Sequence, residues 1–115
     1  MVVKKKSKVE ATILEDENLK YVSRKILIGP EDGSHRIVMR LFRVEPGGYT
    51  PYHLHDFEHV VKVEKGQGVV VDAAGRETLL EEDSCAYIAP NEKHQFRNPF
   101  KEPFEFLCII LNQDR

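Results

Sequence analysis

The sequence contains no long apolar run, no tryptophan and only two cysteines among its 115 residues. A membrane-spanning helix needs about 20 consecutive apolar residues, so we expect no transmembrane segment and no membrane partner. The basic cluster at residues 4–8 is followed by neither an apolar stretch nor a small-residue cleavage site, which argues against a secretory signal. We therefore expect a cytoplasmic protein in which this cluster is a solvated terminus.

Neither the cysteines nor the charges indicate a specialised class of protein. Cys85 and Cys108 lack the C-x-x-C spacing of zinc and redox motifs, and without a secretion signal we expect reduced, buried thiols. The 17 basic and 19 acidic residues give a net charge of -2, and beyond Lys8 the basic residues are scattered along the chain. This distribution argues against nucleic acid as a partner.

The sequence does contain a series of short β-branched and aromatic runs separated by turn residues. Such runs predict strands, and no sustained helical periodicity predicts a long helix. Short strands with frequent turns predict an all-β sandwich or barrel. We expect a single domain over residues 1–115, with its core at about 24–112 and an N-terminal arm at 1–23. The predicted strands cover residues 25–28, 36–44, 59–63, 68–71, 85–89 and 104–111.

Four of the five histidines gather in a compact pattern. His53, His55 and His59 lie close together, and His94 follows downstream. Neutral imidazole is a common metal ligand, and an H-x-H pair on an extended strand places both rings on one face. The pattern therefore predicts one mononuclear metal site. We expect His35, which lies next to a turn and an arginine, to be an ordinary surface or core histidine.

Strand parity orients these side chains, because successive residues of a strand point to opposite faces. Polar residues at alternate positions after His59 turn that histidine inward and Glu58 outward, although Glu58 is an alternative ligand if the strand begins late or carries a bulge. Polar neighbours turn His94 inward in the same way, and Glu105 marks the outer face of the last strand. The inner positions predict a pocket wall that consists of Phe96, Phe104, Phe106, Cys108 and Ile110.

At these residues the sequence resembles the cupin superfamily. The first cupin motif matches, in its spacing, Gly47, His53, His55, His59 and Gly66, and the second matches residues 90–98 around His94. The likeness extends from about 37 to 111 and is strongest to small single-domain cupins with four histidines, known chiefly as manganese-binding proteins from thermophiles. It implies a double-stranded β-helix jelly roll that binds one divalent metal. The implied ligands are His53, His55, His59 and His94.

Three features depart from the common cupin pattern. His59 occupies the position of a frequent glutamate ligand, and Glu58 is displaced from it by one residue. Ser84 stands where the second motif often begins with Gly, and residues 90–94 form a segment that is one residue short and lacks its Gly. The first departure changes the ligand set, whereas we expect the other two to affect only the turns.

The ligand types limit the metal only in part. An all-imidazole site suits Zn, Cu, Fe, Ni and Mn, but four protein ligands would saturate tetrahedral Zn and leave two positions open on an octahedral ion. We therefore prefer Mn or Fe. The resemblance implies a cupin-type dioxygenase that acts on a small organic substrate. A non-catalytic small-ligand or metal-dependent sensor is the main alternative, and a non-redox isomerase is less favoured because no general base besides the ligands is evident in the pocket.

A homodimer is the expected assembly, since cupins commonly dimerise. Val60 and Leu107 are apolar residues on predicted outer faces, and the N-terminal arm contains the strand formers Val9, Thr12 and Ile13. A second subunit that covers these residues would remove their apolar surface from water.

Overall fold

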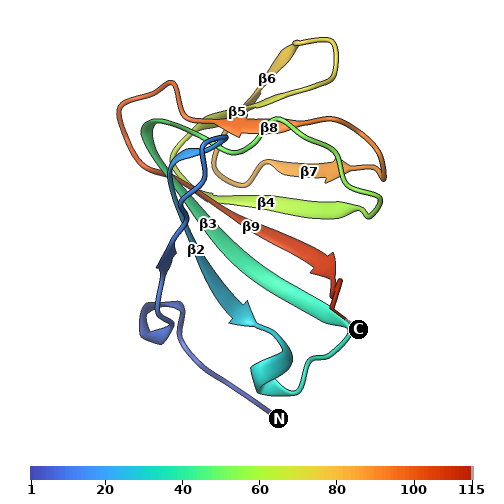
Figure 1. The fold of residues 1–115 in the computed structure, drawn as a ribbon. Helices are drawn as coiled ribbons and strands as arrows, with labels where there is room; N and C mark the ends of the chain where they lie inside the picture. Colours follow the sequence, from blue (N-terminus) through green and yellow to red (C-terminus); the bar gives the residue numbers. More distant parts are fainter. Residues whose placement is uncertain (115) are drawn as a thin grey trace.

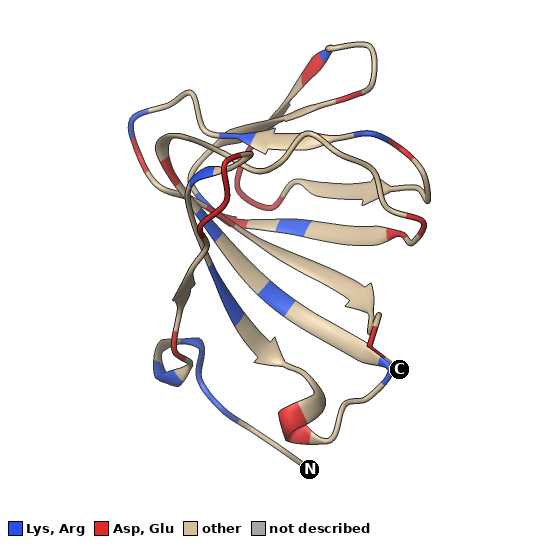
Figure 2. Ribbon diagram, viewed as in Figure 1, with Lys and Arg blue, Asp and Glu red and all other residues tan. Residues whose placement is uncertain are grey.

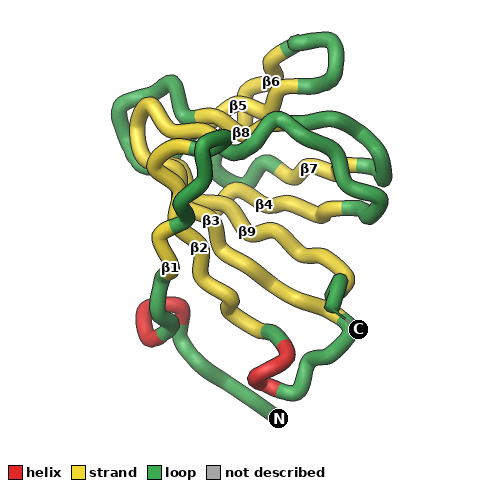
Figure 3. The backbone as a smooth tube through the Cα atoms, in the orientation of Figure 1, coloured by secondary structure: helices red, strands yellow, loops and turns green. Residues whose placement is uncertain are grey.

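A computed structural model describes residues 1–114 and consists almost entirely of strands and loops (Figure 1, Figure 3). The helical segments of this part are two short 3-10 turns, η1 (Lys6–Lys8) and η2 (Pro30–Asp32). Within residues 1–114 no helix is long and apolar enough to cross a membrane. The strands are β1 (Thr12–Ile13), β2 (Lys20–Ile28), β3 (Ile37–Tyr49), β4 (His59–Lys65), β5 (Gly68–Val71), β6 (Glu77–Leu80), β7 (Cys85–Ile88), β8 (Gln95–Arg97) and β9 (Phe104–Leu111).

These strands form one curved sheet, as predicted. The order is β6-β5-β8-β3-β9-β4-β7, with β2 paired to β3 and β1 paired to β2. The long strand β3 pairs with three other strands. It runs antiparallel to β2 and β9, and at its end Tyr49 pairs with Arg97 of β8. This shared strand joins the two halves of the sheet, so that it curves into the nearly closed barrel of a jelly roll.

Alternation along the strands places one face of the sheet in the core. On β4 the residues at alternate positions from His59 to Val63 are buried, while Val60, Lys62 and Glu64 are exposed. The predicted parity of this strand is therefore confirmed. The apolar cluster that the inner faces share consists of Val22, Val44, Val61, Val63, Leu80, Ile88, Phe96, Phe104, Phe106 and Cys108.

Two turn residues of the motifs have clear structural roles. The Asn98 side chain is buried, and its Nδ2 donates to the carbonyl oxygens of Val44 at 2.9 Å and Glu102 at 2.7 Å. Gly66 has a φ of +71°, and a Cβ at this position would overlap the carbonyl of Pro103. Both residues hold the start of β9 against the rest of the sheet, which only an amide and a glycine can do at these sites.

The structure has more strands than the sequence patterns predict. The patterns miss β1 and β8, which are only two and three residues long, and β6, which is mostly exposed and so shows no alternation. The core also begins earlier than the predicted start near residue 24. β2 starts at Lys20, and Val22 is 2% exposed.

One predicted burial state is wrong, and one outer residue is more buried than its face suggests. Cys85 is exposed rather than buried, because it begins β7, where it and Tyr87 face outward, whereas Cys108 is buried as expected. Glu105 is only 8% exposed although it lies on the outer face. Its carboxylate is covered by Arg43 Nη1 at 2.8 Å and by Lys6 Nζ of the N-terminal arm at 3.8 Å. The arm thus contacts its own chain.

Candidate metal centre

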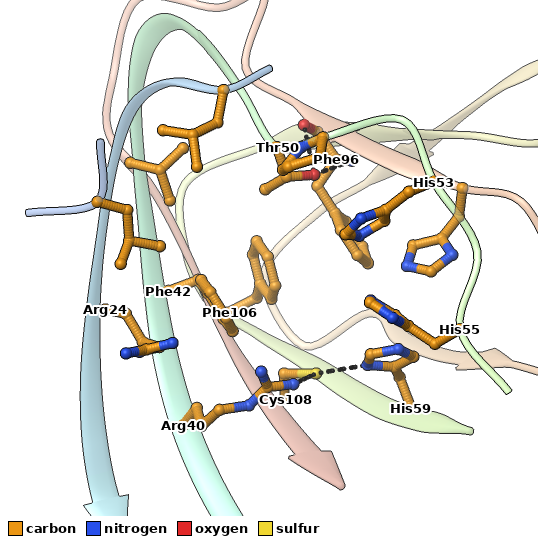
Figure 4. A pocket seen from close by; sticks show the side chains of 15 residues that line it. Arg24, Arg40, Phe42, Thr50, His53, His55, His59, Phe96, Phe106 and Cys108 are labelled. Carbon is orange, nitrogen blue, oxygen red and sulfur yellow. Dashed lines mark hydrogen bonds between the residues drawn. The ribbon is translucent and has the colours of Figure 1, made fainter. Parts of the chain in front are cut away.

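The four predicted ligands lie together at one end of the sheet. His53 and His94 form an isolated antiparallel bridge in which each backbone N–H donates to the other carbonyl, at 3.1 and 2.9 Å. His55 follows in the loop before β4, and His59 is the first residue of β4. Neighbouring ring centroids are 4.2 Å apart for His53–His55, 5.1 Å for His55–His59 and 5.1 Å for His59–His94. We call these four residues the histidine rim (Figure 4).

Two of these rings are oriented by hydrogen bonds through Nδ1. His94 Nδ1 lies 2.8 Å from the Glu92 carbonyl oxygen, which can only accept, so Nδ1 carries a proton and, in the neutral tautomer of this ring, the lone pair is on Nε2. His59 Nδ1 lies 3.3 Å from Cys108 Sγ, and its Nε2 is buried without a hydrogen-bond partner among residues 1–114. Metal-ligating histidines are commonly held in this way through the nitrogen that does not bind the metal.

Three of the four histidines in the rim have lowered pKa values. The pKa of His59 is lowered to about 3, mainly by burial and in addition by the nearby His94 and Arg40. Burial is also the main cause of the lowered pKa values of His53 and His55, and neighbouring histidines add to it. These three rings are therefore neutral near pH 7, the form in which an imidazole can bind a metal.

The rim opens on a cavity of about 250 Å³ with mostly apolar walls. Phe96, Phe106 and Cys108 line it as predicted, whereas Phe104 and Ile110 belong to the core: Phe104 is completely buried against Gly68, and Ile110 packs on the core cluster. Parity gives the face of β9 correctly, but only the middle of the strand borders the cavity. The other residues of the wall are Leu14, Leu19, Val22, Arg24, Arg40, Phe42, Thr50 and Pro51.

Residues of β2 and β3 also line this cavity, which was not predicted from the sequence. Arg40 and Phe42 lie on the inner face of β3, and Arg24 lies beside them on β2. Arg40 and Phe42 share the parity of the buried Val38 and Val44, but Leu41 of the opposite parity is also buried, so parity alone does not single them out. The N-terminal arm also supplies Leu14 to the wall, so it serves its own chain's cavity.

Two further residues lie away from the histidine rim. Glu58 is exposed, and its Oε2 accepts a hydrogen bond from the Tyr87 hydroxyl at 2.5 Å. This carboxylate does not line the cavity, which places the alternative ligand on the outer face. His35 is exposed as well, on the segment between η2 and β3, and its backbone carbonyl accepts from Asn112.

The ring nitrogens do not yet stand in ligating positions. In the part of the chain that the structure describes, no group of three or more His, Cys, Asp or Glu side chains is arranged to hold a metal ion. The ring spacings nevertheless fit one. With a metal–nitrogen distance of about 2.1 Å, two imidazole centroids on an octahedral ion are about 4.5 Å apart in cis and about 6.4 Å apart in trans. The ring centroids are 4.2–6.0 Å apart, close to these values, and rotation of the side chains would be needed to bring the nitrogens together.

Solved structures of known proteins share this architecture over nearly the whole chain. The polyketide cyclase RemF from Streptomyces resistomycificus is 28% identical with a TM-score of 0.91, over 96% of this chain and 79% of that chain. A cupin 2 domain-containing protein from Halorhodospira halophila is 40% identical with a TM-score of 0.72, over 80% and 65%. The cupin-2 domain protein Rru_A2000 from Rhodospirillum rubrum is 26% identical with a TM-score of 0.82, over 100% and 76%.

The sequence itself also matches a known protein family. No curated protein matches the chain. The family model described as a cupin domain matches residues 40–110, which include all four residues of the histidine rim. This match covers more than half of the chain and extends from within β3 to the last residues of β9. The chain therefore belongs to the cupin family.

Proposed function

We propose that this cupin is an enzyme that holds one divalent metal through His53, His55, His59 and His94 and acts on a small organic substrate. One arrangement supports the proposal most: the histidine rim, in which burial lowers the pKa values of His53, His55 and His59, surrounds one end of a mostly apolar cavity. Imidazoles must be neutral to bind a metal, and a shielded cavity keeps them so. Mn or Fe is the preferred ion, with Zn, Ni or Cu as other candidates.

Such a metal, when bound, would supply Lewis-acid chemistry or a site for dioxygen. The chain's own residues hold and shield the site. Cys108 and the Glu92 carbonyl restrain the rings of His59 and His94 from behind. Phe96 and Phe106 stack with centroids 4.5 Å apart and exclude water from the cavity floor. An aromatic floor of this kind favours a substrate with an aromatic or hydrocarbon body.

The preferred reaction class is dioxygenation. The residues that line the cavity include no aspartate or glutamate, so the usual carboxylate bases of a non-redox isomerase are missing from its wall. A second candidate is ring closure of a polyketide-like substrate without oxygen, which is favoured by the 28% identity to the polyketide cyclase RemF. Both reactions would use an apolar cavity next to a metal, and only the first consumes dioxygen.

Elemental analysis of protein purified from its native host tests the metal, and oxygen uptake with small phenolic and diketone-like compounds tests the reaction. We expect one divalent ion per chain and oxygen consumption that depends on it. His59→Ala should lose both, whereas His35→Ala, the matched exposed histidine, should keep both. Turnover without oxygen uptake would replace dioxygenation by the cyclase candidate. Ligand binding without any turnover would leave a sensor or binding module.

We also propose a homodimer that uses the outer face of the sheet. Val60 pairs with Tyr87 on one side and with Ile109 on the other, and these side chains are 51%, 59% and 37% exposed. Such an apolar strip is typical of an association surface. Sedimentation should give a dimer that Val60→Lys dissociates, while Leu79→Lys on the distant strand β6 leaves it intact. A wild-type species near 13.3 kDa would contradict the proposal.

A further inference from the structure

Two arginines face the cavity from neighbouring strands. Arg24 lies on β2 opposite Phe42 of β3, and Arg40 lies on β3 opposite Ile26 of β2. In this register the two arginines are diagonal neighbours on one face of the sheet, about 7–8 Å apart, which is within reach of long side chains. Figure 4 shows both on the β2–β3 side of the cavity, with Arg40 next to Cys108, which lies between Arg40 and His59. We call Arg24 and Arg40 the arginine wall.

The two guanidinium groups have few partners of their own. Within residues 1–114, the Nε atoms of Arg24 and Arg40 are buried without a hydrogen-bond partner, and neither arginine forms an ion pair. Arg40 Nη2 donates to Cys108 Sγ at 3.0 Å, and its guanidinium lies 4.9 Å from the centre of the Phe42 ring. Buried donors that remain unpaired usually await a ligand or water.

Arginines on the outer faces behave differently. Arg43 contacts Glu45 at 2.7 Å and Glu105 at 2.8 Å, and Arg97 contacts Glu77 at 2.7 Å. Figure 2 shows the basic segments along β2 and β3, with most acidic residues in the connections between strands. Arg43 and Arg97 are thus paired with carboxylates, whereas the residues that line the cavity include two arginines and no acidic side chain.

We propose that Arg24 and Arg40 form a carboxylate-binding subsite inside this cavity. Two like charges on neighbouring strands repel each other unless an anion lies between them. The planar fork of guanidinium matches a carboxylate with two parallel hydrogen bonds. The cavity of about 250 Å³ limits the ligand to a small molecule. Because Phe42 and Phe106 line the same cavity, the geometry assigns a small aromatic or similarly apolar carboxylate.

This subsite specifies the substrate class of the proposed enzyme, and in that respect it rests on the proposed function. The carboxylate would bind the arginine wall, and the opposite end of the molecule would face the histidine rim. Carboxylate binding itself needs no metal, so the two proposals can fail separately.

The test compares benzoate and 2-naphthoate with benzamide and 2-naphthamide, which have the same shape without the charge. Calorimetric titration is carried out on the protein as purified and again after treatment with a chelator, because a carboxylate could also bind a metal directly. We expect at least one of the two carboxylates to bind at least about tenfold more tightly than its amide in both preparations.

The variants Arg24→Gln and Arg40→Gln should each reduce the carboxylate preference about tenfold, since each removes one charged partner of the anion. Arg76→Gln is the matched control, because it makes the same change of charge on an exposed residue of the β5–β6 connection. It should bind like wild type. Circular dichroism checks that each variant is folded, and Arg24→Lys provides a milder replacement if Arg24→Gln is not.

Three results would overturn the subsite. These are binding of neither carboxylate by the chelator-treated protein, equal binding of acid and amide, or a carboxylate preference that survives in both arginine variants. Each of these leaves the metal proposal standing if elemental analysis finds a divalent ion. Conversely, an arginine-dependent preference in a protein that binds no metal would support the subsite and refute the metal centre.

Discussion

The histidine rim and the arginine wall lie on two sides of one cavity and are built in different ways (Figure 4). The rim consists of residues in loops and at strand boundaries: His53 and His55 precede β4, and His94 precedes β8. The wall consists of residues within β2 and β3, whose positions follow from strand register. Burial keeps His53, His55 and His59 of the rim neutral, whereas arginine keeps its charge at all ordinary pH values.

This difference indicates a division of labour within the cavity. Neutral imidazoles suit a cation, and fixed guanidinium groups suit an anion. Cys108 joins the two sides, because its Sγ lies 3.3 Å from His59 Nδ1 and accepts from Arg40 Nη2 at 3.0 Å. Variants of the histidine rim should therefore affect metal binding, and variants of the arginine wall should affect the selectivity for charged ligands. Cys108 contacts both sides, so its variants could affect both properties.

The largest expected effect separates the two sides. His53→Ala and His94→Ala should each abolish stoichiometric metal binding, since three imidazoles hold a divalent ion less well than four, while Arg24→Gln should keep the metal. Elemental analysis after dialysis measures this, and the β-rich circular dichroism should persist because the apolar core is separate from the rim. Full metal occupancy in both histidine variants would contradict the four-histidine centre.

A smaller effect is expected where the two sides meet. Cys108→Ala should weaken metal binding about 10–100-fold, the usual effect of losing a group that orients a ligating histidine. Cys108→Ser keeps a hydrogen-bonding group beside His59 and should recover part of the affinity. Competition with a chromophoric chelator measures both variants. If Cys108→Ala binds metal like wild type, the thiol does not orient His59.

Lower pH should reduce the free energy of unfolding of the metal-free protein through protonation of the histidine rim, since the arginine wall stays charged. The folded pKa of His59 is lowered to about 3 from 6.5, so between these values the unfolded chain binds more protons than the folded one. The free energy of unfolding therefore falls as pH decreases through this window, by at most about 1.4 kcal/mol per pH unit for one histidine. Chemical denaturation from about pH 7 to about pH 5 should show a shallower decline for His59→Gln than for wild type. Equal slopes would mean that His59 is not shielded.

The smallest expected effect concerns Glu58, which borders the rim in sequence but not in space. Its carboxylate accepts from Tyr87 on the outer face. Glu58→Gln keeps the shape of the side chain and should leave the metal content unchanged. A site emptied by this substitution would show that the carboxylate turns inward when metal binds.

The fold and the grouping of the histidines could be predicted because their signals are local. Short alternating runs give the strands, and parity correctly turns His59 and His94 inward, where both are 5% exposed. Motif spacing selects Gly66 and Asn98, whose contacts at the start of β9 explain why these residues are needed. Whether the four rings bind a metal stays a prediction.

The arginine wall could not be predicted because its signal is not local. Leu41 and Val44 are both buried although they have opposite parity, so alternation along β3 does not identify the inner face. The position of Arg24 depends on a β2–β3 register with shifts between Lys20 and Val22 and between Ile26 and Ile28. The position of a residue along its strand is also hard to predict. Parity places Phe104 on the inner face, but it does not show that Phe104 lies in the core instead of the cavity wall.

X-ray absorption spectroscopy of the metal-loaded wild-type protein tests the central claim most directly. We predict four imidazole nitrogens in the first coordination shell, with about two further oxygen ligands that exchange when a small chelating molecule is added. His35→Ala should give the same spectrum. A closed tetrahedral site, a sulfur ligand from Cys108 or fewer than four imidazoles would contradict the claim that the histidine rim is an open metal centre.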